Sequence, residues 1–373
     1  MSEYQYYEFQ AIDRPLDQAA QEALRSISSR ARITATSFTN HYEWGDLKGD
    51  PREFMEQWFD LHLYLANWGA RRLMMRLPKR FLNRKDINPF LREVDWVTVS
   101  TSGENVIIDI HRDEVEPDDD WDEGSGWLAT LAPLRADVLS GDFRLLYLLW
   151  LTAVQEELAA DDEVEPLPGI GPLTGALQGF AEFFGIDPDL VRAAAEQDAD
   201  IATTSKGDLR EMLAVIPESE KIELLLCAVE GDAHVTAEMK SRFRKKRPAS
   251  AARRTVGALR MRAREIAMAR ESAVAERMEA ERRRQAEEAE DACRARLEAL
   301  KQRGEGVWRE IEAEIERRNA SGYDRAASLL SDLQALAVEE AGQADFRRRL
   351  ASIRARHEKK GKFIKRVEGL AVR

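Results

Sequence analysis

The residues best suited to acid–base chemistry lie in the segment "NHYEWGDLKGD" at 40–50, which brings His41, Glu43 and Asp46 close together along the chain. Imidazole and carboxylate groups can exchange protons near neutral pH, and loops at strand ends expose such groups on a rigid scaffold. A structural interpretation competes with this one, because the Asp-Pro pair at 50–51 is typical of the first turn of a helix. We favour the structural interpretation and assign no catalytic residue, while an enzymatic site in this segment stays as an alternative.

The segment "PLPGIGPLTG" at 166–175 is similar to the turn of a helix-hairpin-helix motif, whose backbone amides bind a DNA phosphate. In that motif a basic residue usually follows the second glycine, whereas this chain has Pro172, Leu173 and Thr174 there. The acidic stretch "DDEVEP" precedes the loop and would repel a phosphate backbone. We therefore predict a connector between two helices rather than a nucleic-acid site.

No segment has the residue spacing of a metal or cofactor site. The acidic run "DDDWDEG" at 118–124 lacks the glycine and the final carboxylate that a calcium-binding EF-hand loop requires. The histidines lack the spacing of zinc ligands, and His62 is expected to be a core histidine with satisfied hydrogen bonds. Cys227 and Cys293 lie in different segments, which excludes a cysteine cage for zinc and a disulfide framework. We expect neither a metal nor a cofactor.

The segment 241–264 is the strongest candidate for nucleic-acid binding. It carries ten basic residues and no acidic one, a density that could neutralise several phosphates without reading base sequence. Phe243 is its only aromatic residue, so base stacking is not expected. In a second interpretation this run binds the acidic region 113–240, within the chain or on another copy. Both interpretations stay open for these residues: Arg242, Arg244, Lys245, Lys246, Arg247, Arg253, Arg254, Arg260, Arg262 and Arg264.

The charge of the chain is divided unevenly along its length. The total is −12, yet residues 241–373 carry 34 Lys and Arg against 22 Asp and Glu, and residues 113–240 are strongly acidic. The longest apolar run, "LLYLLWLTAV" at 145–154, is too short to span a membrane. The first residues have neither the basic start nor the apolar core of a secretory signal. We expect a cytoplasmic protein with no membrane partner.

The elements that would position these residues begin with an α+β head domain at 1–112. "YQYYEFQAI" and "ARITATSFTNHYEW" read as strands, and "VDWVTVS" with "NVIIDIH" reads as a hairpin. A helix should begin near Pro15, and a second should run through "REFMEQWFDLHLYLANW" after Pro51.

The remainder of the chain is expected to be almost entirely helical. Residues 113–240 should form an acidic helical domain around a buried helix at "DFRLLYLLWLTAVQEEL", capped by Asp142. Residues 241–302 should form a long charged helix, whose apolar seam is too thin for a strong coiled coil but could support a homo-oligomer. The predicted fold class is therefore an α+β N-terminal domain followed by a mostly α-helical remainder.

Residues 303–373 should form a C-terminal helical interaction module. Apolar residues recur there at spacings of three and four, which is typical of amphipathic helices packed as hairpins. We expect this module to bind protein partners, and the candidate contact residues are Trp308, Ile311, Tyr323, Leu329, Leu333, Phe346 and Leu350.

The last part of the chain, 307–370, resembles the helical tail of bacterial SWIM zinc-finger proteins. The resemblance rests on Trp308, Tyr323, Asp324, Leu329, Leu330, Asp332, Leu333, Phe346, Leu350, His357 and Leu370. The zinc finger itself is absent, since the chain has no Cys–His cluster of that type. The resemblance implies that the chain acts in the same complexes as zinc-finger or nucleic-acid-processing proteins. The stretches "HYEWGDLKGDP" and "NWGARRLMMRLP" are also similar to bacterial proteins of unassigned function, and neither resemblance carries over a catalytic residue.

Taken together, these patterns favour a non-enzymatic adaptor or scaffold subunit that acts through helical protein–protein contacts. Two alternatives remain. In one, the chain binds nucleic acid without sequence preference through its basic 240–264 segment. In the other, the 40–50 segment is an enzyme active site.

Overall fold

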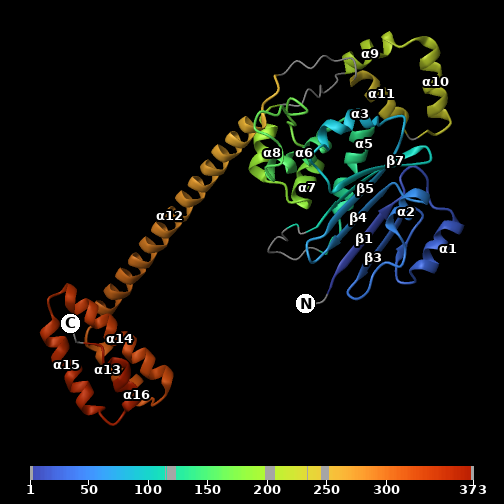
Figure 1. Cartoon of the computed structure of the whole chain (residues 1–373). Helices are drawn as coiled ribbons and strands as arrows, with labels where there is room; N and C mark the ends of the chain where they lie inside the picture. Colours follow the sequence, from blue (N-terminus) through green and yellow to red (C-terminus); the bar gives the residue numbers. More distant parts are fainter. Residues whose placement is uncertain are drawn as a thin grey trace. The chain divides into compact units, whose positions relative to one another are not determined.

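The computed structural model describes residues 3–113, 115, 123–197, 206–232, 234–244 and 252–370. The chain forms two compact units, Met1–Arg270 (unit 1) and Glu271–Arg373 (unit 2) (Figure 1). We expected four regions, but the head and the acidic helical region share one hydrophobic core, and the two ends of the long helix contribute to two different cores. The boundary therefore falls within that helix.

Unit 1 is built around a seven-stranded antiparallel sheet with the order β2-β3-β1-β4-β5-β7-β6. This sheet, followed by a mostly helical remainder, confirms the predicted fold class. The strands are β1 (Gln5–Gln10), β2 (Arg32–Ile33), β3 (Ser37–Tyr42), β4 (Leu61–Ala66), β5 (Arg71–Pro78), β6 (Val97–Ser102) and β7 (Asn105–Arg112).

One predicted helix is wrong over its second half. Helix α2 (Pro51–Gln57) begins as expected, with Asp50 accepting a hydrogen bond from Arg52 N, but the chain then continues as strand β4. Leu61, Leu63 and Leu65 all face the larger core, as the period of two in a strand requires. Strand β5, which we did not predict, pairs with β4 and completes the centre of the sheet.

The two faces of the sheet carry separate hydrophobic cores. On one face, α1 (Gln18–Ile27) and α2 cover an aromatic cluster that includes Phe9, Phe38 and Phe54. The other face is covered by α4 (Trp127–Leu131), α5 (Pro133–Leu139), α6 (Arg144–Gln155), α7 (Gly175–Phe183) and α8 (Pro188–Ala195). The short helices α3 (Arg84–Ile87) and η1 (Asn88–Phe90) lie between β5 and β6 along the chain.

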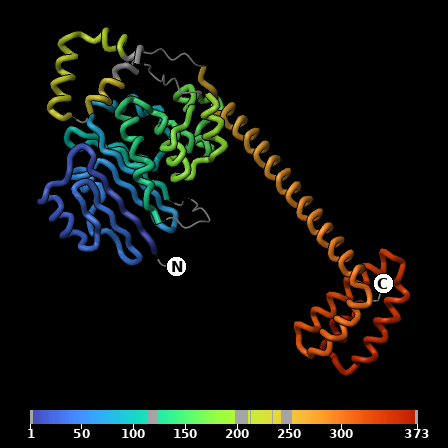
Figure 2. Tube along the Cα trace, turned by 180° about the vertical axis from the view of Figure 1, so that it is seen from behind, coloured from blue at the N-terminus to red at the C-terminus, as the bar shows by residue number. Residues whose placement is uncertain are grey.

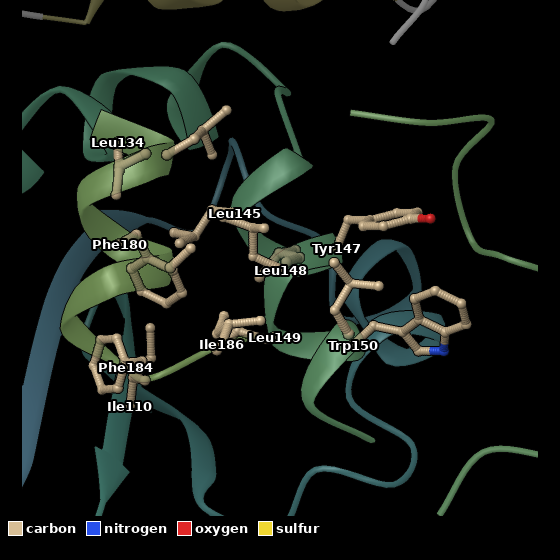
Figure 3. Packing of buried hydrophobic residues seen from close by; sticks show 14 of the residues in the cluster. Ile110, Leu134, Leu145, Tyr147, Leu148, Leu149, Trp150, Phe180, Phe184 and Ile186 are labelled. Carbon is tan, nitrogen blue, oxygen red and sulfur yellow. The ribbon is translucent and has the colours of Figure 1, made fainter. Parts of the chain in front are cut away.

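Helix α6 is the buried central helix that the sequence predicts, since every residue from Arg144 to Val154 is buried. Figure 3 shows Leu145, Leu148 and Leu149 on the side of α6 that faces Phe180 of α7 and Phe184, the residue after α7, with Tyr147 and Trp150 on its opposite side. Because both sides of α6 are covered, its nearly continuous apolar side chains are not exposed to solvent. In the described part of the chain, no helix is both long and apolar enough to cross a membrane.

Three helices extend from the sheet as a helical arm: α9 (Lys206–Val215), α10 (Glu218–Val229) and α11 (Val235–Arg244). Helix α11 lies against α5. Just before α11 begins, Asp232 forms an ion pair with Arg80, and His234 Nε2 lies 3.2 Å from Asp13 Oδ2. Figures 1 and 2 show α10 projecting from the rest of unit 1.

Helix α12 (Val256–Arg303) begins in unit 1 and ends in unit 2. Its first turns bury Val256 and Leu259 in the core of unit 1, and its last turns bury Leu297 and Leu300 in the core of unit 2. Unit 2 is completed by α13 (Glu305–Glu316), α14 (Ala320–Glu339), α15 (Gln343–Arg356) and α16 (Gly361–Val367), the four helices that the sequence predicts.

Candidate interaction surface

The structure separates the residues of the 40–50 segment. His41 lies opposite Tyr6 in the β1–β3 register, and Tyr6 belongs to the larger core, on the face of the sheet that α4–α8 cover. Asp46 instead accepts a hydrogen bond of 2.6 Å from Gln5 Nε2, and Gln5 neighbours Tyr6 in β1, so its side chain lies on the other face. Glu43 is exposed. An acid–base pair of His41 with Asp46 therefore does not form.

Asp46 takes part in a packing network instead. Gln5 Oε1 accepts hydrogen bonds from the hydroxyls of Tyr7 and Tyr64, at 2.8 Å and 3.3 Å. Burial, with the nearby Asp46 carboxylate, raises the pKa of Tyr7 to about 12, so the hydroxyl stays protonated and donates. The network orients these side chains on the sheet.

The loop 166–175 is the structural connector that we predicted. The amides of Ile170 and Gly171 donate to the carbonyls of Ala194 and Gln197 at the end of α8, so they do not face a phosphate. Arg144, buried beside Asp142, donates to the Pro172 carbonyl at 2.7 Å from the inner side. The hydroxyl of Thr174 then caps α7.

Arg254, a candidate for nucleic-acid binding, is instead part of a buried clasp. Its backbone and side chain donate to the fully buried carboxylate of Glu165, and its remaining guanidinium donors reach the carbonyls of Ala193 and Ala194. Tyr147 Oη also donates to Glu165, at 2.6 Å. The clasp anchors the start of α12 to α6 and α8. The guanidinium of Arg254 is engaged in these bonds and is not available to a phosphate.

The neighbouring basic residues pair with the acidic region in the same way. Arg260 donates to Asp161 at 2.5 Å and to the carbonyls of Val154 and Ala159. Arg262 pairs with Glu196, and Arg270 with Asp189. Of the two interpretations, the geometry of Arg254, Arg260 and Arg262 supports binding within the chain. Among the other candidates, Arg253 is exposed, Arg242 and Arg244 fall at the end of α11, and Lys245, Lys246 and Arg247 lie outside the described residues.

The apolar stripes of 303–373 are covered by each other rather than left for a partner. Ile311, Tyr323, Leu329, Leu333, Phe346 and Leu350 are all buried in the core of unit 2, and Trp308 packs against that core with Arg349 above its ring. Periodicity predicted the apolar faces correctly, but α13–α16 bury them in one bundle. The structure therefore places these candidate partner-contact residues in or against the core of unit 2 and not on an open binding surface.

The described residues contain no cluster of three or more His, Cys, Asp or Glu side chains arranged to hold a metal ion. The residues Asp118–Asp122 of the acidic run lie outside the described part. A hollow of about 770 Å³ opens beside α7 and α8, with Arg112 and Arg192 in its lining. Arg112 pairs with Glu156, and Arg192 pairs with Asp189.

The surface that stands out is an exposed apolar face on α10, which we call the α10 face. It consists of four residues at the spacing i, i+3, i+4, i+7, which places them on one side of a helix. Their exposed fractions are 52% for Ile222, 66% for Leu225, 55% for Leu226 and 86% for Val229. Val215, at the end of α9, is 70% exposed. A contiguous apolar face of this kind is typical of a protein-binding site.

The surroundings of the α10 face are acidic. Residues 206–232 carry seven acidic residues against three basic ones. Only Leu224 of α10 is buried, so one residue attaches the helix and the opposite side is left for other contacts. The sequence did indicate a helix here, and its signal for a second face was the apolar run "IELLLCAV", which has more apolar positions than one attachment needs.

Comparison of the chain with protein-family models, with curated proteins and with solved structures found no significant match.

Proposed function

We propose that this protein is a non-enzymatic adaptor that docks a basic amphipathic helix of a partner protein onto the α10 face. The observation that carries the proposal is the exposure of Ile222, Leu225, Leu226 and Val229 along one side of α10. An apolar helix face that lies in a groove or against another helix is a common mode of recognition, with anchors at this same spacing.

Charge selects the class of partner. The acidic residues around the α10 face favour a helix with Lys and Arg beside its apolar stripe, and they speed its association. A second copy of α10 would bring like charges together. The exposed middle of α12 does not fit either, because residues 271–292 carry more acidic than basic side chains. A different protein is therefore the occupant that the charges favour.

The alternatives receive less support from the geometry. Nucleic-acid binding loses Arg254, Arg260 and Arg262, whose donors are engaged within unit 1. An enzymatic site in the 40–50 segment is less well supported, because His41 and Asp46 lie on different faces of the sheet. The resemblance of 307–370 to the SWIM tail adds, by analogy only, zinc-finger or nucleic-acid-processing proteins as the class of partner. Cys227 and Cys293 are both free thiols, which fits a cytoplasmic location as part of the proposal.

The test is a comparison of captured proteins. The tagged full chain is used to capture partners from its native cells, beside the variant Leu225→Asp/Val229→Asp and the control Val338→Asp. Val338 is a matched control because it is an apolar residue, 58% exposed, on α14 of unit 2. We expect at least one protein to be retained by the wild type and the control and lost with the α10 variant.

The retained protein should bind the purified wild type directly and bind the α10 variant at least about 30-fold more weakly, because apolar anchors at the centre of an interface each contribute about 2 kcal/mol or more. Its contact segment should be a basic amphipathic helix. Capture of the same proteins in the same amounts by all three chains would contradict the proposal.

A further inference from the structure

Strand β6 forms one edge of the sheet in unit 1 and pairs only with β7 among the described strands. Its six residues, "VTVSTS", include no charged residue and no proline, and the β6–β7 register runs one to one without a bulge. Charged residues, prolines and bulges usually protect the edge strands of natural proteins from further pairing, and β6 has none of them. The opposite edge, β2, is only two residues long and is protected by its shortness.

The register shows which backbone groups of β6 face outward. Ser102 and Asn105 flank the two-residue turn of the β6–β7 hairpin, so they form a hydrogen-bonded pair. Pairs alternate along an antiparallel ladder, and hence the amides and carbonyls of Val99 and Thr101 point away from β7. These outward groups can receive another strand.

A hollow of about 650 Å³ adjoins this edge and is lined by residues 99–101 of β6. Leu82, Ile87 and Val106 supply apolar lining from the core side. Lys79 and Arg84, both exposed, line the same hollow together with Arg80, whose guanidinium pairs with Asp232, and Asp86 is the acidic residue of the lining. An extended segment on the β6 edge would therefore place alternate side chains beside an apolar lining and a basic rim.

We propose that the β6 edge binds an extended, acidic segment of a partner protein by strand addition. Backbone hydrogen bonds to Val99 and Thr101 give the segment its register. Alternate apolar side chains enter the adjoining hollow, and acidic side chains pair with Lys79 and Arg84. A second copy of β6 fits less well, because it has no acidic side chain to meet the basic rim. This surface is separate from the α10 face and selects a partner of the opposite charge.

The proposal is tested by fluorescence anisotropy with the full chain. The probe is a fluorescein-labelled peptide of about ten residues that alternates Val and Asp, and the control probe alternates Val and Lys. We expect saturable binding of the acidic probe only. Thr101→Pro removes an outward amide, and Lys79→Glu/Arg84→Glu reverses the rim, so each should weaken binding at least about tenfold.

Matched variants separate this site from general effects. Thr101→Val keeps the outward amide, and Arg318→Glu changes an exposed arginine of unit 2, so both should bind like the wild type. Leu225→Asp/Val229→Asp should also bind the acidic probe normally, because the α10 face is a different surface. If Thr101→Pro proves unstable by circular dichroism, the charge-reversal variant decides.

Three outcomes of the binding assay would overturn the proposal: no saturable binding of the acidic probe by the wild type, equal binding of both probes, or wild-type affinity in the charge-reversal variant. Sedimentation provides the remaining check. A dimer of the wild type that Thr101→Pro dissociates would show that a second copy occupies the edge, and would also overturn it.

Discussion

His62 lies within β4 at the centre of the sheet and is fully buried, with its ring stacked on Phe9 at 3.9 Å between centroids. Its Nδ1 lies 3.0 Å from the carbonyl of Glu8, while Nε2 has no hydrogen-bond partner in the described part of the chain. The sequence predicted a satisfied core histidine, and only one of the two nitrogens is satisfied. Burial lowers the pKa of His62 to about 3, so the ring is neutral in the folded protein.

Replacement of this ring should change how stability depends on pH. In the unfolded chain His62 regains its ordinary pKa of 6.5, so between about 3 and 6.5 the unfolded state binds the additional proton and wild-type stability falls as the pH falls. His62→Phe keeps a flat ring against Phe9 and removes this titration. The variant should gain stability relative to the wild type by up to about 1.4 kcal/mol per pH unit below 6.5. Urea unfolding at several pH values measures the difference, and a difference that stays constant from pH 7 to pH 4 would contradict it.

The clasp of Arg254 predicts a contrast between two adjacent arginines. Arg254→Gln leaves the buried Glu165 carboxylate without its cation and should lower the free energy of unfolding of unit 1 by about 3 kcal/mol. Arg253→Gln changes an exposed neighbour and should cost less than about 0.5 kcal/mol. Denaturant titration of both variants is the measurement, and equal losses of stability would show that the clasp is not structural.

At the scale of single elements, the middle of α12 differs from both of its ends. The residues 271–292 are exposed apart from Glu281, which is half-buried. Arginine and glutamate pairs along the helix, such as Arg283 with Glu279 and Arg294 with Glu290, support it at a spacing of four residues. Apart from the exposed Val274 and Met278, this stretch presents polar side chains and alanines. A mostly polar helix that is supported by such pairs can persist without packing against a core.

A proline in this stretch should therefore disturb the helix without unfolding either unit. Ala280→Pro costs about 3 kcal/mol of local helix stability, but residue 280 contributes to neither hydrophobic core. Calorimetry should show two transitions, for unit 1 and unit 2, each shifted by less than about 2 °C.

Two core variants are the controls. Leu259→Ala should lower only the transition of unit 1 and Val307→Ala only that of unit 2, because each residue is fully buried in one core. A single merged transition, or the loss of one transition in Ala280→Pro, would show that the units do not unfold independently.

The same elements show where sequence patterns suffice. The continuous apolar composition of α6 and the capping Asp50 of α2 act locally, and both predictions held. The leucines of "LHLYLA" recur at a period of two, which indicates a strand, but the prediction extended the helix that begins at Pro51 through this stretch. Pairing with β1 and β5 holds it as a strand. Which strands pair depends on segments that are far apart in the sequence, so one short segment cannot predict the pairing.

The candidate contact surface was missed for a related reason. A period of three and four residues marks an apolar helix face, but whether a neighbouring helix covers that face depends on tertiary packing. The faces of α13–α16 are covered by one another, whereas the face of α10 is open. The sequence therefore indicated the apolar helix faces but not which of them are covered.

Across the whole molecule, some charged residues form ion pairs within unit 1, whereas others surround exposed surfaces. Arg254, just before α12, and Arg260 and Arg262, in its first turns, pair with acidic residues of unit 1. The acidic arm around α10 keeps its charge and an open apolar face, and the β6 edge has a basic rim. Two surfaces of opposite charge on unit 1 would allow an adaptor to discriminate between two partners by charge as well as by shape.

The central claim, that the α10 face docks a different protein, is tested most directly by site-specific photo-cross-linking in the native cells. A benzophenone amino acid replaces Leu225 in the full chain, and Val338 is replaced in the control. We expect an adduct at position 225, absent at 338, in which the linked peptide comes from a basic amphipathic segment of another protein. An adduct only with a second copy of this chain, or the same adducts at both positions, would contradict it.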